Sequence, residues 1–424
     1  MTTLNAPSAA VCSASTRAVS PARTEARFSA APSQIAPVVI LGGGPIGLVC
    51  ALLLSRQGYA SQLVDARPVE ASQRDRRLLA LSRGTLQVLR CLLGPSFVPM
   101  APIERVHVSS RGDWGATRLG AQDFGGLALG ATVWYADLVG ALARAAAQQP
   151  HIAVQRPRRA LDIRQGVNDI RVSLDDGSTL QANLAIDAEG SPPQARQPRH
   201  CALLADLDFA KTWPAGDAIE RFTREGPLAL LPLPTPARAA DQLGESSTPS
   251  TRMSMIWCLP ASLAQARRQM SQNDLLQCVG QTLGPRIGVP TAIGERSIFA
   301  LHTHRLRRVC EHRLVHLGNA AQSLHPVAGQ GFNLGIRDCV ALVESLVDTR
   351  ALEGGDALTA LQKYVARRRL DRAIVPSLTS ALPRVFSSSA APVVLARSSV
   401  LIALDLVPSL RREFTRLLMF GAPR

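Results

Sequence analysis

The chain has 424 residues, enough for two or three domain-sized cores. With 46% hydrophobic and 19% charged residues it can bury a large core, which excludes a disulfide-stapled miniprotein and a chain that is disordered throughout. The net charge of +15 favours phosphate-bearing partners, but only 4% of the residues are aromatic, so stacked recognition of nucleic acid bases is not expected.

Residues 1–36 are rich in Ala, Ser, Thr and Pro, and this composition predicts a disordered tail. Their arginines and single acid also resemble a mitochondrial transit peptide, so a targeting role stays open. The eight cysteines are scattered without a CxxC pair or metal-ligand spacing, so we expect neither a metal site nor disulfides, and a reducing compartment fits best. No apolar stretch has the length of a membrane span.

Along the chain, residues 37–41, 45–57 and 61–65 predict a strand, a helix and a second parallel strand. Residues 171–174 and 179–182 flank an Asp-Asp-Gly turn and predict a hairpin, with a strand-like run at 183–187. Two apolar runs of strand length within 226–260 flank a polar stretch, 235–252, which we predict to be a surface loop without function. Residues 356–375 predict a helix. The chain is therefore expected to begin with a parallel β-α-β unit, to continue with antiparallel strands and to include a helix near its C-terminus.

A glycine-rich turn lies between the first predicted strand and helix. Gly42, Gly44 and Gly47 fill the pattern GxGxxG, in which they permit a tight turn, close approach of a pyrophosphate and packing of the helix on the sheet. Asp65 follows Gly47 by 18 residues, at the end of the second strand, where an acid can accept hydrogen bonds from an adenosine ribose. Together these features predict dinucleotide binding; the alternative is a turn that only packs.

A second turn of small residues lies in 314–346. Gly318, Ala320 and Ala321 follow an apolar strand, and Gly329 to Gly331 form a flexible turn into a helix that begins near Phe332. The N-terminus of a helix stabilises negative charge, which suits the electron-rich pyrimidine side of a reduced flavin.

Both stretches resemble the flavoprotein aromatic hydroxylases that have a single FAD domain, and more narrowly the ubiquinone-biosynthesis hydroxylases. The resemblance covers nearly the whole chain after Ala36 and includes DRRLLALSRGTLQVL from Asp75, PIERVHVSSRGDWGATRL from Pro102, AIERFTREGPLALLPLP from Ala218, SMIWCLP from Ser254 and YVARRRLDRAIVPSLTSAL from Tyr364. Most members have GDAAH in the second turn. GNAAQ followed by SLHPVAGQGFNLG is similar to the 2-polyprenyl-6-methoxyphenol hydroxylase group.

The resemblance implies an α/β (α+β) fold. Its parts are a Rossmann-like FAD-binding domain of the p-hydroxybenzoate hydroxylase type, an interposed antiparallel-sheet substrate domain and a C-terminal helical segment. We expect residues 37–100, 132–197 and 296–370 in the FAD-binding domain and residues 101–131 and 198–295 in the substrate domain. Residues 371–424 form the expected C-terminal segment.

The resemblance also implies which residues hold FAD. Arg77 would contact the cofactor, with Asp75 fixing its loop, although Arg77 can also be a plain surface cation. His325 is either a catalytic base or a turn residue, and no other catalytic side chain and no metal ligand is expected. The expected cofactor residues are Gly42, Gly44, Pro45, Ile46, Gly47, Asp65, Ala66, Arg67, Arg77, Asn319, Ala320, Pro326, Gly329, Gln330, Gly331, Phe332 and Asn333.

The activity that the resemblance implies is a monooxygenase reaction. A flavin C(4a)-hydroperoxide would insert one oxygen atom of O₂ into the ring of a polyprenylated phenol, giving the 1,4-benzoquinol. NAD(P)H or a protein donor would supply electrons; the choice is open because Glu189 replaces the Asp of the usual Ala-Asp-Gly. Alternatives are another ring position in the same pathway, a flavin reductase or dehydrogenase, and a structural subunit of a quinone-biosynthesis assembly that retains FAD.

The C-terminal segment is strongly basic. From Leu361 onward, eleven Lys and Arg face three acids, a net charge of +8. This segment would rest on an anionic membrane or on partner proteins, or its apolar residues would pack on the FAD domain. We expect a cytoplasmic protein in peripheral contact with the inner face of the membrane, or a mitochondrial matrix protein. The apolar residues in question are Leu401, Ile402, Leu406, Leu417, Leu418 and Phe420.

Overall fold

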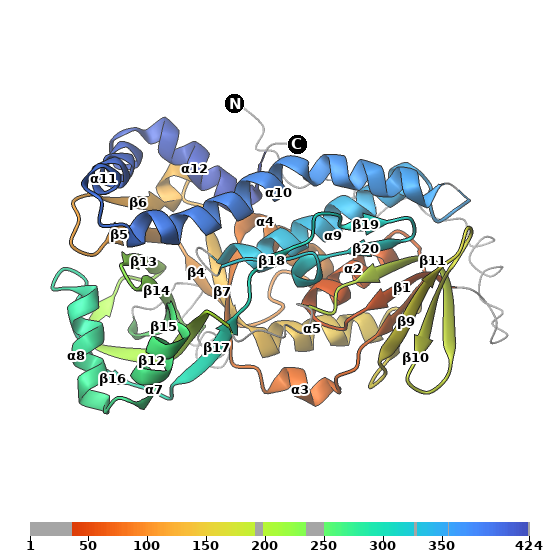
Figure 1. Cartoon of the computed structure of the whole chain (residues 1–424), viewed down its shortest axis with the longest axis horizontal. Coiled ribbons are helices and arrows are strands. Elements are labelled where there is room, and N and C mark those ends of the chain that lie inside the picture. The colour runs from red at the N-terminus through yellow and green to blue at the C-terminus, as the bar shows by residue number, and fades with distance from the viewer. Residues whose placement is uncertain (1–35, 191–197, 235–249, 326–328, 355, 423–424) are drawn as a thin grey trace.

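A computed structural model describes residues 36–190, 198–234, 250–325, 329–354 and 356–422. Residues 1–35 of the expected N-terminal tail and residues 235–249 of the predicted loop therefore lie outside the described residues, whereas Ala36, the last residue of the expected tail, begins strand β1. Two large sheets stand at opposite ends of the molecule, and the C-terminal helices lie along the top of both (Figure 1).

The first sheet has the strand order β19-β20-β11-β1-β2-β8, in which β1 runs parallel to both β2 and β11. Val38 and Ile40 pack against helices on one face, and Val39 and Leu41 pack on the other face against the β9–β10–β11 ribbon. The strands are β1 (Ala36–Leu41), β2 (Ser61–Val64), β8 (Ile152–Gln155), β9 (Ala160–Gln165), β10 (Ile170–Leu174), β11 (Thr179–Asp187), β19 (Cys310–Glu311) and β20 (Leu314–His316).

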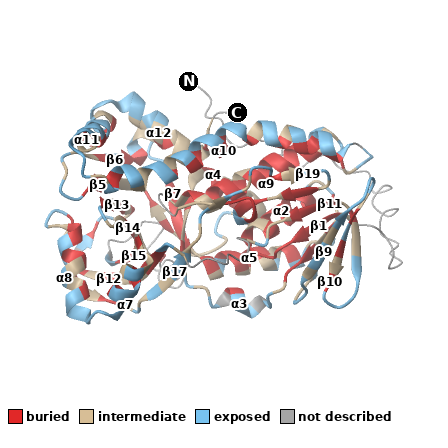
Figure 2. Cartoon of the chain, viewed as in Figure 1, coloured by how far each residue is buried: buried red, intermediate tan, exposed pale blue. Residues whose placement is uncertain are grey.

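Helices α2 (Pro45–Arg56), α5 (Tyr135–Ala147) and α9 (Gln330–Asp348) cover the helical face of this sheet. α2 and α9 are mostly buried along their length (Figure 2). α2 begins with Pro45 in its first turn and continues as an almost unbroken apolar run, as expected for a helix packed between a sheet and other helices.

The second sheet has the order β16-β12-β15-β14-β13-β5-β6, with β17 also paired to β12. Its outer face carries a core around Trp257, covered by α7 (Ala261–Gln269) and α8 (Gln272–Leu283). The strands are β5 (Arg105–Ser110), β6 (Ala116–Gly120), β12 (His200–Trp213), β13 (Asp217–Thr223), β14 (Gly226–Pro232), β15 (Ser250–Pro260), β16 (Pro290–Ile293) and β17 (Ser297–Leu301).

A small sheet, β3 (Leu78–Ser82), β7 (Gly130–Trp134) and β4 (Ala101–Ile103), lies between the two large sheets. The hydroxyl of Thr132 in β7 donates to the carbonyl of Pro232 in β14 over 2.6 Å, which ties this sheet to the second one. The remaining short elements are α3 (Val69–Gln73), α4 (Arg83–Leu93), η3 (Ala121–Phe124), β18 (His304–Arg305), η4 (Gly318–Ala320) and β21 (Gln322–Ser323).

The C-terminal helices are α10 (Ala357–Ser387), α11 (Ala391–Leu406) and α12 (Pro408–Phe420), so the boundary expected at residue 371 falls inside α10. α10 contacts both α9 and β13, so it bridges the two halves of the molecule. No single helix in the described ranges is long and apolar enough to cross a membrane. α11 and α12 pass that test only when taken together, and a bend of 100° separates them.

Most predicted elements are confirmed, including the parallel start, the hairpin of β10 and β11, and the antiparallel pairing of β14 with β15. The run at 183–187 is no separate strand, because it continues β11 and pairs with β1. The helix predicted over 356–375 extends to Ser387 and includes Pro376 and Pro383. β17 joins the second sheet, so that sheet extends beyond residue 295.

Candidate active site

The first glycine turn joins β1 to α2. Gly42 has a φ of +101°, and a Cβ there would lie 2.5 Å from the carbonyl oxygen of Ala188. A Cβ on Gly47 would overlap the carbonyl oxygen of Gly42, so two of the three glycines are required by packing. Gly44 has an ordinary φ of −73°, and its nearest neighbour in the Cβ direction is the Arg67 guanidinium at 3.9 Å. Gly44 therefore leaves room for a ligand.

Two helix N-termini open onto one cavity. Neither Gly44, before α2, nor Gly329, before α9, provides a side-chain cap for the first-turn N–H groups. These N–H groups carry partial positive charge and can bind phosphate or a flavin ring that gains negative charge. A Cβ on Gly331 would meet no atom within 4 Å, so this turn is also open. The cavity residues from both turns are Gly44, Pro45, Ile46, Gly329, Gln330, Gly331 and Phe332.

Ile46 brings the two turns together. A Cβ on Gly318 would lie 3.0 Å from its Cγ1, and a Cβ on Gly335 would lie 2.7 Å from its Cδ1. Small residues in η4 and α9 therefore let α2 approach closely. Asn319 is exposed at the cavity wall, while its neighbour Ala320 is buried.

Asp65 lies beneath the first turn and is 3% exposed. Its carboxylate accepts hydrogen bonds from the backbone N–H groups of Gly43 and Arg67, each at 2.8 Å, and from Arg156 at 2.8 Å. These contacts lock the turn onto the end of β2. Sequence reasoning missed Arg156, because no local pattern indicates that a residue 91 positions away reaches Asp65. A ribose contact by Asp65 stays a prediction, as does one by the adjacent Ala66.

Arg77 is held in a fixed orientation at the cavity wall. Its guanidinium makes a bidentate pair with Asp75, with contacts of 2.9 and 2.6 Å, and lies 4.6 Å from the ring centre of Tyr135 and 4.5 Å from that of Phe299. This arrangement agrees with the expectation that Asp75 fixes the loop of Arg77. Burial raises the pKa of Tyr135, so its hydroxyl stays protonated near neutral pH.

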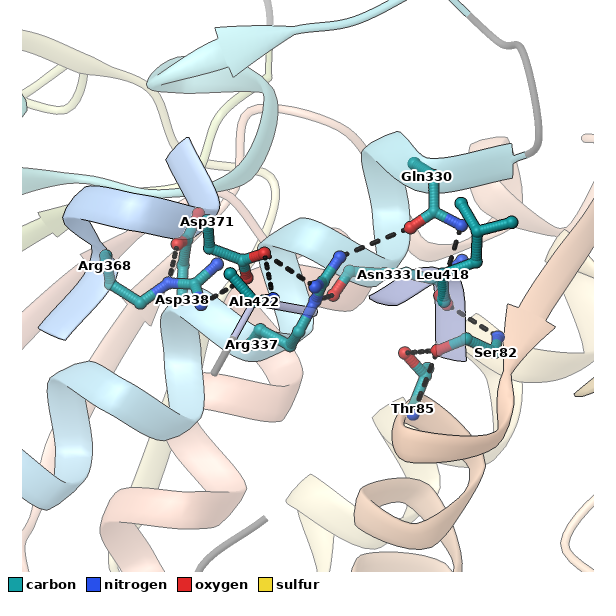
Figure 3. A network of polar contacts seen from close by, with 10 residues as sticks. All are labelled: Ser82, Thr85, Gln330, Asn333, Arg337, Asp338, Arg368, Asp371, Leu418 and Ala422. Atoms are coloured by element: carbon teal, nitrogen blue, oxygen red, sulfur yellow. Dashed lines mark hydrogen bonds and ion pairs between the residues drawn. The ribbon is translucent and has the colours of Figure 1, made fainter. Parts of the chain in front are cut away.

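A polar network supports the second turn from behind (Figure 3). The Asn333 amide donates to the carbonyls of Ala80 and Gly329 and accepts from the N–H of Ser82, so it fixes the start of α9 against β3. Gln330 donates to the Leu418 carbonyl in α12. Both side chains were expected to bind the cofactor; they line the cavity, and the contacts of Asn333 show how it shapes the turn.

The same network continues into α10. Arg337 of α9 pairs with Asp371 at 2.9 Å, and Arg368 pairs with Asp338 at 2.7 Å and with Asp371 at 2.6 Å. Burial lowers the pKa of Arg337 to about 10 although Asp371 opposes this, so Arg337 remains charged at neutral pH. The backbone N–H of Ala422 also donates to Asp371, which connects the chain end to the second turn (Figure 3).

The cavity has a volume of about 1000 Å³ and extends from the two turns to the second sheet and the C-terminal helices. Its wall is polar near the turns, with Arg67, Arg77 and Asn319. Elsewhere the wall is mostly apolar, including Val106, Leu119, Leu231, Leu382, Leu401 and Leu417. One space therefore offers a polar end and a large apolar end.

Two carboxyl groups line this cavity in the described part of the chain. Glu189 lies at the turn end, where burial and then the charge of Asp187 raise its pKa. Glu220 lies on β13 among apolar residues, and burial raises its pKa to about 7. Sequence reasoning treated Glu189 as a departure from the family pattern and did not single out Glu220.

His325 lies outside the wall of this cavity. Its ring centre is 6.2 Å from that of His200, and burial followed by the charge of His200 lowers its pKa to about 4. A neutral imidazole is therefore expected at neutral pH, and its role as a base stays an untested prediction. Pro326, also expected at the site, lies outside the described residues.

Comparison with known proteins identifies the family of this chain. A family model described as an FAD binding domain matches residues 35–375. The chain is 28% identical to a ubiquinone hydroxylase of Rhodospirillum rubrum over 90% of this chain and 89% of that protein. It is 26% identical to the 3-demethoxyubiquinol 3-hydroxylase of Escherichia coli over 90% and 97% of the respective chains.

Solved structures share the fold. A probable FAD-dependent monooxygenase of Pseudomonas aeruginosa has a TM-score of 0.68 at 19% identity, covering 87% of this chain and 100% of that chain. A p-nitrophenol 4-monooxygenase of Pseudomonas putida has a TM-score of 0.69 at 15% identity, covering 92% and 99%. The glycines that leave room for a ligand and the two uncapped helix N-termini fit FAD. The chain belongs to the FAD binding domain family, and its relatives include ubiquinone-biosynthesis hydroxylases.

Proposed function

We propose that this FAD-dependent monooxygenase hydroxylates the ring of a polyprenylated phenol in ubiquinone biosynthesis. The observation that carries the proposal is one cavity that joins the two glycine turns to a large apolar chamber. A small polar ring needs only part of that chamber, whereas a ring with an isoprenoid tail can use the apolar wall built by α10, α11 and α12.

The chain's own residues would bind and orient the reactants. The uncapped backbone N–H groups in the first turns of α2 and α9 would hold the pyrophosphate and the flavin pyrimidine, respectively. Arg77 and Asn319 would contact the cofactor from the polar end of the cavity. The apolar wall would hold the phenol ring beside the flavin and exclude water. Reduced FAD supplies the activation of O₂ that no side chain provides.

Among substrates, we propose 2-polyprenyl-6-methoxyphenol, hydroxylated to the 1,4-benzoquinol. The Asn319 and Gln322 variant of the second turn supports this choice over other ring positions. The test is incubation of the FAD-loaded chain with 2-geranyl-6-methoxyphenol, NADH and O₂, with the product's ring position assigned by NMR. We expect oxygen uptake coupled to a para-hydroxylated product. Hydroxylation at another position would favour a sister activity, and reduction without oxygen uptake would favour a dehydrogenase.

We further propose that α11 contacts the membrane that holds such a substrate. Several of its large apolar side chains are exposed, among them Leu395 at 70% and Leu406 at 72%. The apolar C-terminal residues singled out from the sequence differ in their exposure to solvent. Ile402 and Leu406 are exposed, Leu401 is buried, and Leu417, Leu418 and Phe420 are half-buried. The exposed apolar surface of α11 thus supports membrane contact, while α12 packs inward.

A further inference from the structure

Glu220 occupies an unusual place in the second sheet. Ala218, Glu220 and Phe222 of β13 line the cavity. Ile219 also borders the cavity, but its side chain packs in the core on the opposite face of the sheet. On that opposite face the Arg221 guanidinium donates to the Thr282 carbonyl of α8. The carboxyl group of Glu220 is therefore directed by the strand's own alternation into the chamber that we assign to the substrate.

The surroundings of Glu220 are apolar. Its neighbour on β5 is Val108 and its neighbour on β14 is Ala229, both of which line the same cavity. From α10, which packs against β13, Leu378 and Leu382 line the cavity. In the described part of the chain, no hydrogen bond or ion pair to the Glu220 side chain is found, so its carboxyl oxygens are available to a ligand.

The other charged and titratable groups near Glu220 are neutral, paired with other residues or on the opposite face of the sheet. Cys258 of β15 lines the cavity, and burial followed by the charge of Glu220 raises the pKa of its thiol, which stays neutral. Arg397 of α11 also lines the cavity, but its guanidinium pairs with Asp113 at 2.7 Å and donates to the carbonyls of Val385, in the last turn of α10, and Ser388, which follows α10. His107 of β5 is paired with Ile219, so it lies on the opposite face from Glu220.

A carboxyl group without a protein partner in an apolar chamber is costly, because burial without a hydrogen-bond partner destabilises the fold. A substrate that brings its own donor would offset this cost. The ring hydroxyl of a phenol is such a donor, and it is the polar group of the substrate class proposed above.

We propose that Glu220 is the residue that accepts the hydrogen bond of the phenol's ring hydroxyl and takes its proton during hydroxylation. This inference rests on the proposed function. The O–H bond of the phenol breaks, its proton moves to a carboxylate oxygen of Glu220, and the electron pair stays on the phenol oxygen. The ring would then be more electron-rich, which favours insertion of the oxygen atom that reduced FAD and O₂ would supply. The ring carbon loses its C–H proton as aromaticity is restored, the phenol oxygen regains a proton, and the proton held by Glu220 returns to solvent after the product leaves.

The direction of pH dependence follows from the environment of Glu220. Burial raises the pKa of Glu220 to about 7, so the carboxylate that accepts the proton forms as pH rises through that value. Hydroxylation by the unaltered chain should therefore increase from about pH 6 to about pH 8.

The test is the variant Glu220→Gln, in which the amide keeps the size of the side chain but cannot take a proton. We expect FAD to stay bound with an unchanged visible spectrum and oxygen uptake to continue, now releasing hydrogen peroxide. We expect hydroxylated 2-geranyl-6-methoxyphenol to fall about a hundredfold and the pH-dependent rise to vanish. Unchanged product formation with the same pH profile would overturn the proposal.

The matched control is Glu104→Gln, which removes a carboxyl group that lies outside the cavity wall and next to Arg105. It should leave product formation and the pH profile as they are. If Glu220→Gln fails to fold, the unaltered chain still tests the role of Glu220: above pH 7 it should bind 2-geranyl-6-methoxyphenol about tenfold more tightly than the O-methyl ether. Equal affinities would reject the role of Glu220.

This binding measurement also separates the two proposals. An unaltered chain that binds the phenol in preference to the ether but forms no hydroxylated product would contradict the proposed function alone. A chain that forms the product, and whose Glu220→Gln variant forms it equally well, would contradict only the role of Glu220.

Discussion

The glycines of the first turn have different roles: two are needed for backbone packing and one leaves space for a ligand. Gly42 and Gly47 are required by the protein itself, because a Cβ at either position would collide with backbone atoms. Gly44 has no such constraint, since its φ is available to any residue and its Cβ direction is open. What Gly44 provides is room for a phosphate to approach the backbone N–H groups.

This difference predicts distinct outcomes for two substitutions. Gly44→Val should fold normally but bind FAD at least about tenfold more weakly, because the side chain fills the space of the pyrophosphate. Gly47→Ala should lower the thermal midpoint of unfolding in the protein without FAD, because its methyl group overlaps Gly42. Circular dichroism and FAD titration separate the two. If Gly44→Val binds FAD as tightly as the unaltered chain, the assignment of the turn is wrong.

Helices α10, α11 and α12 contribute more than a C-terminal extension. α10 bridges the two halves of the molecule and is anchored at Asp371, which bonds to arginines of α9 and of α10 itself. The connection to α11 is held by the buried pair of Arg397 with Asp113. These contacts place α11 over β6 and complete the apolar wall of the cavity.

The exposed surface of α11 predicts membrane binding. The double variant Leu395→Glu, Leu406→Glu should sediment about tenfold less with vesicles of phosphatidylglycerol and phosphatidylcholine, because two apolar anchors are lost. Val167→Glu is the matched control, since Val167 is 81% exposed in the connection between β9 and β10, away from α11. Equal sedimentation of both variants and the unaltered chain would contradict membrane contact through α11.

Local patterns predicted part of this molecule well. The glycine turn after β1 and the Asp-Gly turn between β10 and β11 each depend on a few neighbouring residues, so the local sequence is sufficient to predict both turns. The extent of α10 was not predictable, because Pro376 and Pro383 usually end a helix and here remain inside one. Arg156 and Glu220 were missed because their roles depend on contacts and cavities formed by distant segments.

In the described part of the molecule, two large sheets, a bridging helix and two glycine turns surround one large cavity, so cofactor and substrate are expected to share one space. The most direct measurement is the visible absorption spectrum of the purified chain before and after addition of 2-geranyl-6-methoxyphenol. We predict a bound flavin whose spectrum shifts with a saturable dependence on the phenol. Protein that binds no FAD, or flavin that does not respond to the phenol at any concentration, would contradict the account.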